Sequence, residues 1–235
     1  MERPVKTHYL ASVDKQVRTM KCVEGWWLPD AEKHLEGVLK ERNGQYQIDH
    51  RNKSLEYVSR WGAAVDIGAN VGLWAKDLCE KFASVYLFEP LPCHIECLVK
   101  NLEKYNNWTL FQCALGEFKG FVDIQPITEL SNSRVVIDTA NPIYPLDILD
   151  TFGLSNIDYM KIDVEGYEEG VINGSHKMLR ENSLVINMEQ KPSVDFGHKY
   201  VCFGAGKKLE SLGFSLQNQF QDDYVFINHH NKYRS

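Results

Sequence analysis

One acid and two glycines that lie close together are the residues of this chain best suited to hold a ligand. The run 65–74 reads VDIGANVGLW, so Asp66 ends an apolar strand, and Gly68 and Gly72 fall in the turn that follows. Glycine has no Cβ, so the backbone can turn tightly and lie against a flat ligand, and the next helix offers N–H groups without intrahelical partners. The run therefore predicts a ligand site where the strand meets the helix.

The acid narrows the class of ligand. A pyrophosphate-binding loop has the pattern Gly-x-Gly-x-x-Gly, but counting from Gly68 places Asn70 and Leu73 at its second and third glycine positions. The carboxylate of Asp66 would repel a diphosphate, whereas it would attract an ammonium or sulfonium cation. S-adenosylmethionine carries both cations, and we expect it as the cofactor. The alternative is an ordinary glycine-rich turn without a ligand.

A second acid follows at the end of the next apolar run. The run 84–90 reads SVYLFEP, in which Glu89 ends a buried strand and Pro90 closes it. An acid about 20 residues after the first loop is the usual partner of two ribose hydroxyls, because a carboxylate accepts hydrogen bonds from both. We expect Glu89 to hold a ribose, and the alternative is a solvated carboxylate at a strand end.

Length and charge indicate one α/β domain and argue against nucleic acid as a partner. The chain has 235 residues, a net charge of −6 and no basic cluster interleaved with aromatic residues. No apolar run approaches the length of a membrane span, and the amino-terminal residues lack the charged head and apolar core of a signal peptide. We expect a cytoplasmic protein that binds no membrane. The sequence predicts no oligomeric state.

The six cysteines are scattered and include no Cys-x-x-Cys pair, so we expect reduced thiols and no disulfide framework. Cys93, His94 and Cys97 form one local cluster. Two sulfurs without two further spaced ligands do not complete a tetrahedral metal site, and we expect no metal there.

Strand and helix patterns alternate along the chain, which predicts an α/β fold with helices on both faces of a mostly parallel sheet. The expected strands are 63–69, 84–90, 108–115, 158–164 and 184–188, with a more polar one at 121–124. The expected helices are 72–82, 92–105, 146–154, 168–182 and one that ends near 212. From 125 to Pro145 the chain shows no strong periodicity, and we expect an insertion that covers the acceptor.

The end of the chain adds two more strands. The runs 214–220 and 224–227 are separated by three residues, which is too short for a parallel crossover, so they form an antiparallel hairpin. The result is a doubly wound, seven-stranded sheet with one antiparallel strand near the C-terminus. That arrangement is typical of class I methyltransferases, whereas dinucleotide-binding folds continue with βα units.

Five segments together resemble the FkbM family of S-adenosylmethionine-dependent methyltransferases. They are VDIGANVGLW at 65–74, FEP at 88–90, PLDIL at 145–149, DYMKIDVEGYE at 158–168 and a strand that ends in Glu189. The resemblance implies a Rossmann-like fold and O-methylation of a small-molecule or glycan hydroxyl. Two features depart from it: Pro145 stands where the family has threonine, and 1–58 has no counterpart. We therefore expect an N-terminal extension at 1–58, acting as a lid or substrate cap, and an S-adenosylmethionine-binding domain at 59–235.

The resemblance implies a role for each matching residue. Residues of the first loop line the methionine moiety, Glu89 holds the ribose, and the end of the third strand flanks the adenine. Lys161 and Asp163 share one face of their strand by alternation, and Asp163 projects into the crevice at its carboxyl end. The expected cofactor-binding residues are Asp66, Gly68, Ala69, Asn70, Gly72, Glu89, Pro90, Cys113, Ala114, Leu115 and Asp163.

Methyl transfer to an alcohol is an in-line displacement, and the hydroxyl needs a base within hydrogen-bond reach. The candidate catalytic residues are Asp163, Glu165, Glu189 and His198. Asp163 and Glu189 end neighbouring strands and would also suit Mg²⁺, but we favour a site without a metal. A helix-capping role is the alternative for Glu165, and a surface or helix-start position is the stronger interpretation of His198.

Trp26 and Trp27 precede a helix that we expect to begin near Asp30, with Asp30 as its N-cap. The simpler interpretation is that both rings pack this helix onto the sheet. The sharper hypothesis is a lid, in which one ring stacks on the acceptor or on the adenosine.

Three functions remain open at this point. An O-methyltransferase is the leading one, and the others are an N-methyltransferase or nucleotide-directed enzyme and a cofactor-binding protein without turnover. Base methylases generally carry an Asn/Asp-Pro-Pro-aromatic element after the fourth strand, where this chain has Asp163-Val164-Glu165-Gly166. That difference argues against the second function.

Overall fold

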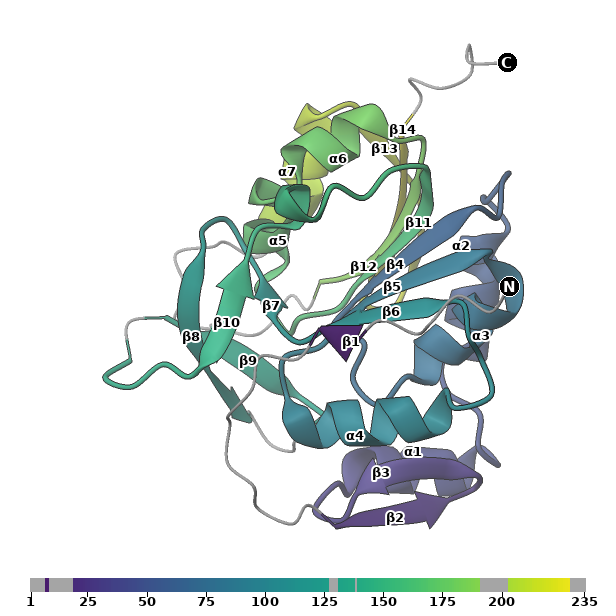
Figure 1. Cartoon of the computed structure of the whole chain (residues 1–235). Helices are drawn as coiled ribbons and strands as arrows, with labels where there is room; N and C mark the ends of the chain where they lie inside the picture. The colour runs from purple at the N-terminus through teal and green to yellow at the C-terminus, as the bar shows by residue number, and fades with distance from the viewer. Residues whose placement is uncertain (1–6, 9–18, 127–130, 138, 191–202, 229–235) are drawn as a thin grey trace.

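A twisted β-sheet forms the centre of the computed structural model, which describes residues 7–8, 19–126, 131–137, 139–190 and 203–228 (Figure 1). The sheet order is β1-β6-β5-β4-β11-β12-β14-β13. The strands are β1 Thr7–His8, β4 Ala63–Ile67, β5 Ser84–Phe88, β6 Trp108–Phe111, β11 Ile157–Ile162, β12 Val185–Glu189, β13 Phe214–Phe220 and β14 Asp223–Asn228. All pairings are parallel except the two made by β14. Apart from the two-residue edge strand β1, this is the seven-stranded sheet expected from the sequence.

Helices cover both faces of the sheet, which confirms the expected fold class (Figure 1). One face packs against α2 Ile48–Leu55, α3 Leu73–Lys81 and α4 Pro92–Asn101. The other packs against α5 Glu168–Asn173, α6 His176–Glu181 and α7 Gly204–Ser211. Every residue of β4 and β11 is buried. Two-sided burial explains why apolar and polar residues do not alternate in these strands, and their charged residues Asp66, Asp158 and Lys161 are buried as well.

The C-terminal hairpin is present as expected. β13 and β14 pair in antiparallel register, and β14 inserts between β12 and β13. The single reversed strand is therefore β14, and β13 returns to the direction of the other strands. This insertion brings Asp223, at the start of β14, opposite Glu189 at the end of β12.

A second sheet replaces two of the expected elements. The expected strand 108–115 ends at Phe111, and Ala114–Leu115 forms a separate strand, β7, in a sheet of order β7-β10-β8-β9. The other strands are β8 Gly120–Pro126, β9 Ser133–Val136 and β10 Tyr144–Asp147. The stretch expected to be an irregular insertion therefore contains strands. Its sequence pattern is weak because β8, β9 and β10 each bury a single residue, and because an apolar residue, Phe121, is 60 % exposed.

Two expected helices are wrong in extent. The segment 146–154 begins as strand β10 and continues as a short 3-10 helix, Leu149–Phe152, because Asp147 accepts hydrogen bonds from Ile148 N–H and the Thr151 hydroxyl. The segment 168–182 is divided into α5 and α6. The chain breaks at Gly174, where an added Cβ would lie 2.0 Å from the carbonyl oxygen of Gly116. That close approach of two backbones leaves no room for a continuous helix with side chains.

The N-terminal region packs on the outside of the helical layer. A hairpin of β2 Met20–Val23 and β3 Trp26–Pro29 and the helix α1 His34–Glu41 lie beside α4 (Figure 1). The helix starts later than expected, and Asp30 is not its cap, because Leu35 N–H is bound by the Glu32 carboxylate. Trp26 donates to the Gly44 carbonyl, and Asn101 hydrogen-bonds the backbone of Trp27. Both tryptophans thus join the hairpin to neighbouring helices and loops instead of packing a helix onto the sheet.

Candidate active site

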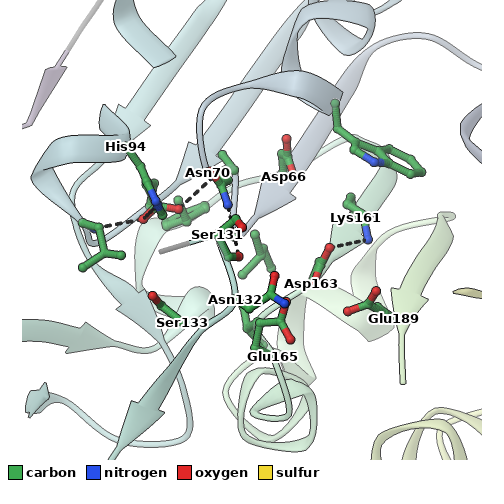
Figure 2. A pocket seen from close by; sticks show the side chains of 18 of the residues that line it. Asp66, Asn70, His94, Ser131, Asn132, Ser133, Lys161, Asp163, Glu165 and Glu189 are labelled. Atoms are coloured by element: carbon green, nitrogen blue, oxygen red, sulfur yellow. Dashed lines mark hydrogen bonds and ion pairs between the residues drawn. The ribbon is translucent and has the colours of Figure 1, made fainter. Parts of the chain in front are cut away.

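A cavity of about 440 Å³ opens at the carboxyl edge of the central sheet, between strand ends and the segment before β9 (Figure 2). Twelve of the residues singled out from the sequence line it. They are Asp66, Gly68, Ala69, Asn70, Glu89, Pro90, Cys113, Ala114, Leu115, Asp163, Glu165 and Glu189. Gly72 is not among the lining residues. It is the N-cap of α3, where its φ of 89° requires the conformational freedom of glycine. His198 lies outside the described residues.

The turn after β4 needs glycine at Gly68 because another loop approaches its backbone. Gly68 has a φ of 81°, and a Cβ there would lie 1.9 Å from the carbonyl oxygen of Asp163. The N–H groups of Gly68 and Ala69 both donate to the Phe88 carbonyl, at 3.0 and 3.1 Å. Asp163 N–H in turn donates to Ile67 O at 3.0 Å. The ends of β4, β5 and β11 are therefore fastened together directly beneath the cavity.

Glu89 connects this turn to the next strand. It is 4 % exposed, and its two carboxylate oxygens accept hydrogen bonds from Asn70 N–H at 2.8 Å and Leu91 N–H at 2.9 Å. His94 Nδ1 lies 3.3 Å from the same carboxylate, so this histidine supports Glu89 and not a cysteine cluster. A carboxylate has about four acceptor positions, so Glu89 retains capacity for ribose hydroxyls at the cavity surface.

Asp66 is a strongly perturbed carboxyl group in the lining of the cavity. It is 1 % exposed, and its Oδ2 has no hydrogen-bond partner within the described part of the chain. Burial raises the pKa of Asp66 to about 7, an effect that the positive charge of Lys161 opposes and the charges of Asp163 and Glu89 reinforce. A buried acceptor without a partner is costly, and a cationic ligand in the cavity would relieve that cost.

The loop after β11 is shaped by a residue that the sequence analysis did not identify as functional. Glu165 has a φ of 53° and Gly166 a φ of 100°, so the chain turns sharply there. The Glu168 carboxylate accepts the N–H groups of Val164 and Gly166, at 3.2 and 3.0 Å. Burial raises the pKa of Glu168 to about 7, although these backbone hydrogen bonds oppose the rise. Glu168 therefore holds the loop that presents Asp163 and Glu165.

Three acids gather at this end of the cavity. Asp163, Glu165 and Glu189 each offer an oxygen, and these oxygens lie within 4.8 Å of one another. Lys161 Nζ lies 3.2 Å from Asp163 Oδ2 (Figure 2). Such a group has the chemistry to accept a proton or a divalent cation, but acidic groups cluster at surfaces without a metal. A site without a metal stays our prediction.

Two walls of the cavity come from the N-terminal region and from the stretch between 125 and Pro145, the two segments expected from the sequence to cover the site, although none of the residues below was a candidate site residue. The N-terminal region contributes His34, Leu35, Tyr46 and Gln47, and the start of β9 with the two residues before it contributes Ser131, Asn132 and Ser133. Neither Trp26 nor Trp27 is among the described residues that line the cavity.

A buried acid joins these two walls. Glu32 is fully buried and accepts Ser131 N–H at 2.9 Å and the Ser131 hydroxyl at 3.2 Å. Asn70 Nδ2 donates to Ser131 O at 3.4 Å. Because Glu32 and Ser131 are 99 positions apart, no local pattern in the sequence reveals the contact.

The order of the central sheet, its single reversed strand and a cavity at its carboxyl edge define a class I methyltransferase fold. The sequence matches the model of the methyltransferase FkbM domain over residues 66–214, which is more than half of its length. The chain therefore belongs to the FkbM family of S-adenosylmethionine-dependent methyltransferases. Comparison with proteins of curated function gives no match.

Two solved structures illustrate the fold. The FkbM methyltransferase of Methylobacillus flagellatus KT is 15 % identical, with a TM-score of 0.51, and the match covers 82 % of this chain and 53 % of that one. This chain thus spans about half the length of that relative. A putative rRNA methylase from Clostridium thermocellum is 12 % identical, with a TM-score of 0.51 and coverage of 78 % and 95 %. At these identities the likeness concerns the fold alone. No helix in the described ranges is long and apolar enough to cross a membrane.

Proposed function

We propose that this methyltransferase acts on a hydroxyl group of a small molecule, sugar or glycan. The observation that supports this most directly is the group of three acids, Asp163, Glu165 and Glu189, at one end of the cavity that also contains Asp66 and Glu89. A neutral hydroxyl needs a base beside it, whereas a neutral amine already has a reactive lone pair.

The residues present fit the cofactor of the family. The buried Asp66 oxygen that lacks a described partner suits a cation, and the bare backbone at Gly68 allows close contact with an extended ligand. In this proposal the first loop holds the methionine moiety, Glu89 and Pro90 the ribose, and Cys113 to Leu115 the adenine. When bound, the cofactor supplies an electrophilic methyl group on its sulfonium.

The chain's own contribution is to orient the acceptor and remove its proton. Asp163 is the preferred base, since it directly follows β11 in the middle of the sheet and pairs with Lys161. Glu165 and Glu189 accept hydrogen bonds from other hydroxyls of the acceptor. Amide side chains such as Gln47 and Asn132 add donors, which together with acids suit a polyhydroxylated molecule.

Location and partners belong to the same proposal. A cytoplasmic location is supported by Cys79, Cys97 and Cys113, which are buried thiols without a disulfide. The net charge of −6 supports an acceptor other than a nucleic acid.

The test is methylation with S-adenosylmethionine that carries a deuterated methyl group, over pools of glycans, polyols, phenols and amines. We expect one labelled methyl group on an oxygen of the product, located by tandem mass spectrometry. Asp163→Asn is the inactive comparison, and Asp158→Asn, at the opposite end of β11, is the matched control. A labelled methyl group on nitrogen would contradict hydroxyl methylation, and no transfer to any pool would contradict the proposed acceptor class.

A further inference from the structure

A buried ammonium group lies behind the candidate base. Lys161, on β11, is 2 % exposed, and its Nζ is 3.2 Å from Asp163 Oδ2 and 3.5 Å from Asp223 Oδ1. The same Nζ lies over the ring of Trp74, 4.9 Å from its centroid. An ammonium removed from water needs such partners, because burying an unpaired charge costs several kcal/mol or more.

The partners of Lys161 are themselves held in place by three further elements. Asp223, at the start of β14, is 2 % exposed, and its second oxygen lies 2.8 Å from His50 Nδ1 on α2. Trp74 on α3 donates its ring N–H to Gln47 Oε1 at 2.7 Å. These contacts hold the ammonium at the wall of the cavity, so its position relative to Asp163 is set by the sheet and two helices.

Of the two ion pairs of Lys161, the shorter is the one with Asp163, which lines the cavity. Asp163 is part of the cavity lining and 23 % exposed at its side chain, whereas Asp223 is almost fully buried. A lysine required for folding alone would be paired by Asp223, which His50 holds in place. The additional contact reaches the carboxylate that the proposed function uses as the base.

We propose that Lys161 is a positioning residue of the methyl-transfer reaction, which orients the Asp163 carboxylate toward the acceptor and keeps it in its ionised form. The inference rests on the proposed function, because it needs Asp163 as the base. The ammonium keeps its own proton and acts through Asp163. The ionisable groups around it are Asp66, Tyr159, Asp163, Glu189 and Asp223, with His50 behind Asp223.

The main variant is Lys161→Met, which keeps much of the length of the side chain and removes its charge. We expect kcat to fall by about 100-fold or more, in the range found for loss of general-base assistance, with the acceptor KM changed far less. The dissociation constant of S-adenosylhomocysteine should stay within about threefold at about pH 9, where Asp66 is ionised even if its pKa rises by about one unit on loss of the ammonium. The acid limb of the pH profile should move up by about one unit, because a neighbouring cation lowers a carboxyl pKa by roughly 1 to 3 units. Lys161→Arg should recover part of kcat and the original pH profile.

A matched control separates positioning from folding. Asp158, on the same strand, is 6 % exposed, pairs with Arg60 and accepts Gly62 N–H, far from the cavity. Asp158→Asn should lower the urea midpoint without changing kcat or the pH profile. If Lys161→Met lowers the midpoint but keeps the wild-type kcat and pH profile, Lys161 is structural and the proposal is overturned.

Two further arms keep the test decisive. Where Lys161→Met does not fold, Lys161→Gln replaces it as the neutral variant, and an unchanged kcat and pH profile in that variant would overturn the proposal. Where the wild type methylates none of the acceptors, the proposed function fails, and carbon-13 NMR of the labelled aspartates still measures the titration of Asp163, assigned with Asp163→Asn. The proposal then requires a raised Asp163 pKa in the folded lysine variant, and an unchanged titration contradicts it.

Discussion

The buried carboxyl of Asp66 predicts that cofactor binding depends on pH near neutrality. The folded protein without ligand holds this group with a pKa of about 7, raised by burial from its ordinary 3.8. A cation bound beside Asp66 favours the ionised form, so binding lowers the pKa and releases a proton. Affinity for S-adenosylmethionine should therefore rise with pH and level off above about 7.

The size of the effect follows from the same pKa. If only the ionised form binds well, the apparent dissociation constant scales as one plus ten to the power of the pKa minus the pH. Lowering the pH from 7.5 to 5.5 then weakens binding about 25-fold, or about 2 kcal/mol. The effect of pH on folding stability has the opposite sign to its effect on cofactor binding. Because the folded pKa is raised, this group's contribution to stability without ligand is full below pH 3.8 and is lost as the pH rises through about 7.

Isothermal titration calorimetry in two buffers of different ionisation enthalpy measures both quantities. We expect about half a proton to be released at pH 7, and a pH dependence that disappears in Asp66→Asn along with part of the affinity. The reasoning is refuted if Asp66→Asn keeps the same pH dependence, or if the wild type binds equally well at pH 5.5 and 7.5 with no proton release.

Three further outcomes follow from the site. Gly68→Ala should lower the free energy of unfolding by more than about 3 kcal/mol in urea titrations, because it adds a backbone clash to the positive φ. The control Gly25→Ala, where φ is 82° and the surrounding space is open, should cost about 1 kcal/mol. Equal losses in the two variants would contradict the close approach of the Asp163 carbonyl to Gly68. Glu32→Ala should weaken S-adenosylhomocysteine binding about 5- to 10-fold, because it releases Ser131 and leaves groups unpaired at a cost of about 1 to 3 kcal/mol. The control Glu36→Gln should leave the affinity unchanged. If Glu32→Ala binds as tightly as the wild type, Glu32 does not anchor this wall of the cavity. Glu168→Gln keeps an acceptor for the loop but removes a carboxyl group whose pKa is about 7. As the pH rises from 5 to 8 without ligand, the free energy of unfolding of the wild type should therefore fall by about 2 kcal/mol more than that of the variant. Parallel curves of unfolding free energy against pH would contradict the burial of Glu168 as an acid.

The cofactor half of the site could be predicted from the sequence because it is built from strand ends. Parallel strands end at one edge of a sheet, so Asp66, Glu89 and Asp163 were expected to converge once each was placed at the end of an apolar run. The structure places all three at the cavity. Their roles toward the cofactor stay predictions until a ligand is bound.

The remaining parts of the site depend on contacts between segments that are far apart in the sequence, and local sequence patterns do not reveal such contacts. Glu32 meets Ser131 across 99 positions, and Lys161 meets Asp223 across 62. The helix expected at 146–154 was wrong because its apolar spacing fits a strand or a helix, and side-chain hydrogen bonds of Asp147 decide the outcome. Of the second sheet, only the strand at 121–124, within β8, was expected. The strands β9 and β10 were missed because each buries a single residue, which is too few to show an alternation of apolar and polar residues.

A crystal structure of the full chain with S-adenosylhomocysteine tests the central claim most directly. We expect the ribose hydroxyls on Glu89, the amino group of the ligand beside Asp66, and the adenine next to Cys113 to Leu115. A nucleoside bound elsewhere, or one in this cavity without contact to either Asp66 or Glu89, would contradict the account.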